Sequence, residues 1–93
     1  MILSYATAAT RRFAEDGDPR KFRGLDADKA CELLAALNAA KSLDDISPLK
    51  RVGLHPLKGD RRGQWAMTVN AGWRICFKFA DGNAVDVEIV DYH

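Results

Sequence analysis

The spacing of apolar residues changes near residue 51, from a helical period of about 3.6 residues to the alternation of a β-strand. Before that point, apolar residues recur at the positions that form one face of a helix: Ala30, Leu33, Leu34, Leu37 and Ala40. After it, apolar and polar residues alternate over 64–69, 74–79 and 85–89. We therefore predict an α+β fold of two layers. Helices cover one face of a mainly antiparallel meander of three to four strands and leave the other face open.

Capping residues predict where the helices begin and end. Thr7 is suited to begin a first helix, and the residues 17–19, Gly-Asp-Pro, are suited to end it. Asp26 can cap the second, longer helix. The β-forming residues 2–5 predict a short opening strand, and residues 44–48 predict a loop or a short extra turn.

The alternation also predicts which side chains of the strands form the core. These are Trp65, Met67, Val69, Ile75, Phe77, Phe79, Val85, Val87 and Ile89. Two turn sequences connect the strands, 70–72 (Asn-Ala-Gly) and 81–83 (Asp-Gly-Asn). The second is a strong hairpin signal, because Asp and Gly tolerate the positive φ that such turns require.

The chain has 93 residues, so we expect residues 1–93 to form a single domain. No stretch approaches the roughly 20 apolar residues that span a bilayer. The amino terminus has no basic segment ahead of an apolar run, so we expect a cytoplasmic protein. Cys31 and Cys76 form neither a CxxC pair nor a Cys/His cluster. They predict two reduced, mostly buried thiols and no metal site.

The net charge of +1 conceals opposed local charges. Residues 46–80 hold seven basic and one acidic side chain, a local charge of +6, and residues 1–24 carry +2. Residues 25–45 carry −3 and residues 81–93 carry −4. Basic charge concentrated in one third of a chain is typical of binding to a polyanion.

The segment 54–63 is the most basic loop of the chain. It holds His55, two glycines and the cations Lys58, Arg61 and Arg62. Glycines let the backbone approach a phosphate, and cations neutralise it. The loop lacks the GxxxxGK[ST] pattern of a P-loop. It predicts either a phosphate-binding loop or an ordinary solvated one.

The predicted strand 74–79 carries two more cations on the face opposite its core residues. For Lys78 we expect an exposed ion pair with Asp86 or Glu88 across the hairpin. Arg74 follows a turn directly, from where it could face the basic loop. It is therefore a second candidate for phosphate binding.

The chain closes on Asp91, Tyr92 and His93, directly after a strand. A frayed terminus is one interpretation, and a tail that the strand holds near the open sheet face is the other. RNA cleavage by its own 2′-OH needs a proton acceptor, a proton donor and cations around the phosphate. This tail, His55 and the nearby cations would supply that set without a metal.

These motifs resemble the HigB-type toxins of the RelE/ParE superfamily, also called plasmid maintenance system killer proteins. The resemblance rests on the run LHPLKGDR at 54–61, on Gly63 and Trp65, on Trp-Arg-Ile at 73–75, and on the closing Asp-Tyr-His at 91–93. Length and the order of elements extend it over the whole chain.

The resemblance implies the toxin of a type II toxin–antitoxin system that cleaves mRNA in the A site of the 70S ribosome. The product would carry a 2′,3′-cyclic phosphate, and no metal or cofactor would be needed. The implied partner is a HigA-like antitoxin with a helix-turn-helix, which neutralises the toxin.

The same resemblance implies roles for individual residues. The positions that match the family's catalytic residues are His55, Asp91, Tyr92 and His93, and those that match its phosphate-binding cations are Lys58 and Arg74. His93 or Asp91 would have the main proton-transfer role, and His55 a positioning or second proton role. Tyr92 would stack on a base or orient the nucleotide.

This sequence departs from the family at Gly72, the residue before Trp-Arg-Ile, where relatives commonly have an asparagine able to contact a base edge. Gly72 offers only its backbone there, so no codon preference carries over. Two other functions stay open on the sequence. One is a module that binds the ribosome or RNA without cutting it, and the other is a gyrase-inhibiting toxin like ParE, which shares the fold without the ribonuclease residues.

Overall fold

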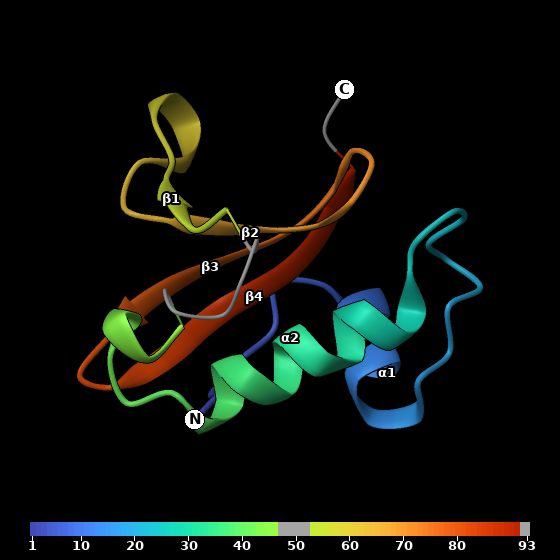
Figure 1. Ribbon diagram of the computed structural model, residues 1–93, viewed down its shortest axis with the longest axis horizontal. Helices are drawn as coiled ribbons and strands as arrows, with labels where there is room; N and C mark the ends of the chain where they lie inside the picture. Colours follow the sequence, from blue (N-terminus) through green and yellow to red (C-terminus); the bar gives the residue numbers. More distant parts are fainter. Residues whose placement is uncertain (47–52, 92–93) are drawn as a thin grey trace.

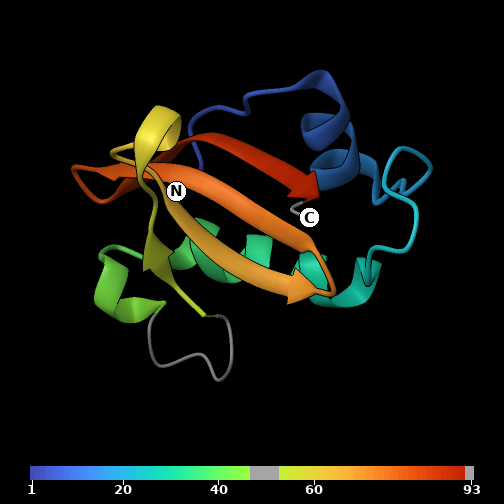
Figure 2. The same ribbon diagram turned by 90° about the horizontal axis from the view of Figure 1, so that it is seen from above.

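A computed structural model describes residues 1–46 and 53–91. Its elements, in chain order, are α1 (Ala8–Asp16), α2 (Ala27–Ala39), the 3-10 turn η1 (Leu43–Asp45), β1 (His55–Pro56), the 3-10 turn η2 (Gly59–Arg61), β2 (Trp65–Asn70), β3 (Trp73–Ala80) and β4 (Asn83–Asp91). The four strands form an antiparallel sheet in the order β1-β2-β3-β4. The two helices lie on one side of this sheet and η2 on the other (Figures 1 and 2). The predicted α+β architecture is confirmed.

Both helices begin at the predicted caps. The side chain of Thr7 accepts a hydrogen bond from the backbone N–H of Thr10 at 3.1 Å, and α1 ends at Gly17, which has φ 70. The side chain of Asp26 accepts from the N–H of Lys29 at 3.1 Å. Each cap satisfies an N–H that has no partner within the helix.

Thr10 also connects α1 to the sheet. Its side chain is fully buried, and its hydroxyl oxygen accepts the backbone N–H of Ile89 on β4 at 3.1 Å. The hydroxyl of Thr7 donates to the same oxygen at 2.8 Å. The capping residues of α1 therefore also fix its position against the last strand.

The predicted opening strand forms only two isolated parallel bridges to β4, Ile2 to Ala84 and Tyr5 to Val87. Backbone N–H groups of this segment donate to Ala84 and Val87 at 2.8 and 2.9 Å. Between these contacts lies Asp86, whose φ of 53 interrupts the extended backbone of β4. A continuous ladder does not form because the partner strand is irregular there.

The same irregularity corrects one predicted core position. Val85 pairs with Lys78 and is half-buried, whereas Ala84 and Val87 are fully buried. Asp86 and Val87 together lie opposite Phe77, which is a β-bulge. The bulge moves the alternation of β4 by one residue, so Ala84 replaces Val85 on the core face.

The core lies between the sheet and the helices. Its largest fully buried side chains come from both layers: Phe13, Leu37, Ile46, Met67, Val69, Ile75, Phe77 and Val87. Cys76 is buried as predicted, but the prediction was wrong for Cys31, which is exposed. Cys31 follows Ala30 directly and lies one position off the buried stripe of α2.

Candidate active site

Two rows of paired residues cross the sheet face that points away from the helices. In the first row, His55 on β1 pairs with Ala66, Ala66 with Cys76, and Cys76 with Glu88. In the second row, Thr68 pairs with Arg74 and Arg74 with Val90. With strands about 4.8 Å apart and about 3.4 Å per residue, the Cα atoms of His55 and Arg74 lie about 12 Å apart. The structure thus places these two predicted residues on neighbouring rows of one face.

The ring of His55 is oriented by the backbone just before β1. Its Nδ1 lies 2.8 Å from the carbonyl oxygen of Gly53. A carbonyl oxygen only accepts, so Nδ1 carries the hydrogen and the neutral ring keeps its basic lone pair on Nε2. His55 is exposed, so this tautomer presents a proton acceptor at the surface.

The cations of the basic loop differ in their surroundings. Lys58 and Arg62 flank η2 and are exposed. Arg61 is instead held, because its guanidinium donates to Gln64 at 3.1 Å and to Glu88 at 3.2 and 3.3 Å. Lys58 and Arg62 are therefore the loop cations most accessible to a phosphate.

Arg74 is held against the β2–β3 turn. Its Nη1 donates to the carbonyl oxygens of Ala71 and Trp73 at 2.8 and 3.0 Å. These contacts to the turn fix the guanidinium of Arg74 on the row next to His55.

The ion pair predicted for Lys78 across the hairpin is confirmed, since its Nζ lies 3.5 Å from the carboxylate of Asp86.

Asp91 is the last residue of β4, where it pairs with Trp73 and is exposed. Strand alternation puts its side chain on the side of Trp73, whereas Val90 shares the side of Arg74. Tyr92 and His93 lie outside the described residues. Asp91 thus ends the sheet one residue beyond the row of Arg74, with its side chain on the face opposite that of His55 and Arg74.

The β2–β3 turn carries the predicted base-contact position. The left-handed backbone in this turn falls on Ala71, with φ 45, and not on Gly72. The neighbouring amide of Asn70 is used in the fold, because it donates to the carbonyl of Gly24 at 2.9 Å and accepts the N–H of Asp26 at 2.8 Å. The amide of Asn70 is therefore not available for the base contact predicted at position 72.

The structure also has a second basic area, which the sequence did not predict. Arg12, Asp18, Arg20 and Lys21 line a hollow at α1 and the loop after it. Asp18 and Arg20 form an ion pair of 2.7 Å, and the hydrogen bonds from Arg20 lower the pKa of Asp18. The charge of +2 over residues 1–24 was the available signal, but it is weaker than that of the central segment.

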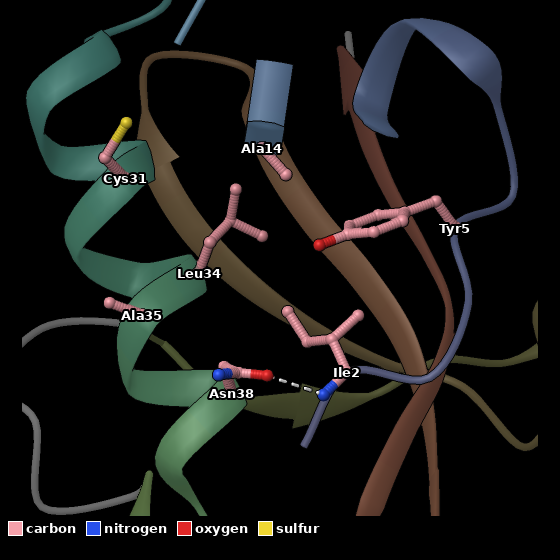
Figure 3. Close-up of a pocket in the computed structure, with 7 residues that line it drawn as sticks. All are labelled: Ile2, Tyr5, Ala14, Cys31, Leu34, Ala35 and Asn38. Carbon is pink, nitrogen blue, oxygen red and sulfur yellow. Dashed lines mark hydrogen bonds between the residues drawn. The ribbon is translucent and has the colours of Figure 1, made fainter. Parts of the chain in front are cut away.

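The helix side of the molecule has its own cavity of about 290 Å³, away from the candidate site (Figure 3). Its lining side chains are Ile2, Tyr5, Ala14, Cys31, Leu34, Ala35 and Asn38. Burial, followed by the charge of Glu15, raises the pKa of Tyr5. The cavity shares no residue with the candidate site.

Residues 1–46 and 53–91 contain no group of three His, Cys, Asp or Glu side chains placed to hold a metal ion. Over the same ranges, no helix is both long and apolar enough to cross a membrane.

Comparison with solved structures identifies the fold. The crystal structure of YafQ from E. coli strain BL21(DE3) superimposes with a TM-score of 0.64 at 18% identity, covering 98% of this chain and 93% of that one. A mutant of E. coli YafQ gives a TM-score of 0.62 at 20% identity, with the same coverage. The chain therefore shares the fold of YafQ.

Sequence comparison then assigns the family. The family described as the RelE-like toxin of type II toxin-antitoxin system HigB matches residues 3–93. The chain is 36% identical over 93 residues to the Endoribonuclease HigB of Proteus vulgaris, with both chains fully covered. The chain belongs to the HigB-like toxin family and is a toxin of a type II toxin–antitoxin system. Its partner is accordingly an antitoxin.

Proposed function

We propose that this toxin is a metal-independent endoribonuclease that cleaves mRNA in the A site of the ribosome. The observation that carries the proposal is the placement of His55 and Arg74 on neighbouring rows of the face that η2 overhangs. The full-length similarity to a protein named Endoribonuclease HigB supports the same chemistry.

In the proposed reaction, the 2′-OH of one nucleotide attacks the adjacent phosphorus and the 5′-oxygen of the next nucleotide leaves. A new P–O bond closes the 2′,3′-cyclic phosphate as the P–O5′ bond breaks. One group accepts the proton of the 2′-OH and another gives a proton to the leaving oxygen. We assign the main proton transfer to His93 or Asp91 and a second proton transfer to His55, while Tyr92 stacks on a base or orients the nucleotide.

Cations next to the phosphate stabilise the charge that builds up in this transition state. Lys58 is exposed on the loop, and Arg74 is fixed by two backbone carbonyls. An arginine held in place loses less conformational freedom when it binds an anion. We assign phosphate binding to these two residues, with Arg62 as a further contact.

Dependence on the ribosome follows from charge and site size. The net charge is only +1, so attraction to free RNA is weak. The reaction rate at a small, exposed site rises most when another macromolecule, here the ribosome, positions the substrate. We propose that the toxin acts in the cytoplasm and that its antitoxin is a HigA-like helix-turn-helix protein.

The test compares mRNA on programmed ribosomes, the same mRNA free in solution, and DNA supercoiling by gyrase. We expect cleavage on ribosomes with cyclic phosphate ends, slow cutting of free RNA and unchanged supercoiling. Inhibited gyrase with intact mRNA would favour the ParE-like alternative. Ribosome binding without cleavage would favour the non-catalytic module.

A further inference from the structure

Glu88 lies on the same sheet face as the candidate site but belongs to neither group of predicted site residues. It is paired with Cys76 in the row that begins at His55. Its carboxylate oxygen Oε1 accepts hydrogen bonds from both terminal nitrogens of Arg61, at 3.2 and 3.3 Å. Arg61 therefore reaches from η2, above β2 and β3, to β4.

This contact closes the loop over the sheet. Ala66 and Cys76 point away from the helices, yet both are fully buried. The η2 turn stands over this part of the sheet (Figures 1 and 2). The prediction of an open second face is thus wrong for this row, because the loop that carries Arg61 covers it.

The contact also joins the two chain segments that carry the proposed chemistry. The loop side bears His55 and Lys58, and β4 ends three residues after Glu88, at Asp91. We propose that Glu88 is a positioning residue: through Arg61 it holds the basic loop at a fixed place relative to the end of β4. This inference rests on the proposed ribonuclease function.

The surroundings of the pair suit a positioning role. The side chains of Arg61 and Glu88 are 30% and 24% exposed, so water and salt weaken the pair less than one at the open surface. Gln64 holds the same guanidinium nitrogen from the loop side at 3.1 Å. The guanidinium of Arg61 thus has partners on both the loop and β4, and the carboxylate of Glu88 already neutralises its charge, unlike the neutral carbonyls that hold Arg74.

Glu88→Ala is the main test variant. We expect kcat on programmed ribosomes to fall about 10- to 100-fold, the cost of a misplaced catalytic group. KM should stay within about threefold and Tm within about 5 °C, because a partly exposed ion pair adds little to global stability. Glu88→Gln keeps an acceptor for Arg61 and should retain most of the activity.

Arg61→Ala should cause the same loss, and the double variant with Glu88→Ala should be no worse than either single one. Asp86→Asn is the matched control, since it removes one negative charge from β4 at a pair that is about half exposed. It should leave kcat unchanged. A lower KM for Glu88→Ala with kcat intact would overturn the inference, because Glu88 would then only withhold Arg61 from the RNA.

Hydrogen exchange separates this inference from the proposed function, since it needs no substrate. Amides of residues 57–64 should exchange faster in Glu88→Ala and at the wild-type rate in Asp86→Asn. Unchanged exchange in Glu88→Ala would overturn the inference even if the wild type cleaves mRNA. If these amides exchange faster in Glu88→Ala but the wild type cuts no mRNA, the proposed function is refuted. The link between the loop and β4 through Arg61 and Glu88 would still hold.

Discussion

Asp91 lies directly across from Trp73 in the β3–β4 ladder, and the indole of Trp73 is fixed to the other layer of the molecule. Its Nε1 donates to the carbonyl oxygen of Arg23 at 3.1 Å. Its ring meets that of Phe22 edge-on, with centroids 5.7 Å apart. The residue that begins the proposed catalytic tail therefore pairs with a strand position anchored by the α1–α2 loop.

Trp73→Phe tests this anchor. The variant keeps an aromatic ring but loses the hydrogen bond to Arg23, which should lower the free energy of unfolding by about 1 kcal/mol. Cleavage should fall severalfold at a temperature where the variant is fully folded, because the end of β4 loses part of its support. Denaturant unfolding and ribosome cleavage assays measure the two effects. Wild-type cleavage by a destabilised variant would show that the anchor serves stability alone.

His55→Asn tests the proton-transfer role without removing the local structure. The Asn amide can still donate toward the carbonyl of Gly53, as Nδ1 of His55 does, but it cannot take up a proton near neutral pH. We expect kcat to fall about 10²- to 10⁴-fold with the fold intact. A rate within threefold of the wild type would limit His55 to a positioning role.

Lys58→Ala and Arg74→Ala test the proposed phosphate contacts. Loss of a hydrogen bond to a charged group costs about 1.5–3 kcal/mol, which corresponds to roughly a 10- to 100-fold loss of kcat/KM. Lys41→Ala is the control, since Lys41 is exposed just after α2 and outside the candidate site. Unchanged cleavage by both variants on programmed ribosomes would remove the electrostatic part of the proposal.

Gly72→Asn introduces the side chain that the resemblance to the HigB-type toxins leads us to expect at this position. Because the positive φ of this turn falls on Ala71, position 72 does not require glycine, and we expect a change of stability below about 1 kcal/mol. The new amide can hydrogen-bond a base edge and should alter the distribution of cleavage sites. An unaltered distribution would place position 72 away from the bases.

Local patterns were sufficient for most of the fold. The caps at Thr7 and Asp26 and the hairpin at Asp81-Gly82 follow from short-range rules, and both turn residues have the expected positive φ. The bulge at Asp86 could not be predicted, because its sequence still alternates and only pairing with β3 reveals the extra residue.

The site was predictable in its residue types but not in their contacts. Arg61 was grouped with Lys58 as a phosphate-binding cation because both lie in one basic loop. Its partner Glu88 is 27 residues away in sequence, and no local pattern signals a contact across two strands. The same limit applies to Arg74, whose side chain bonds to its own turn rather than across the hairpin.

The central claim is that this toxin cuts mRNA on the ribosome with a site that includes the segment Asp91, Tyr92 and His93. The most direct measurement maps mRNA 5′ ends genome-wide after brief induction of the wild type and of His93→Ala. We predict new ends within translated codons for the wild type, and none for a variant that is folded and produced at equal level. The same new ends in both proteins, with growth arrest in both, would contradict the account.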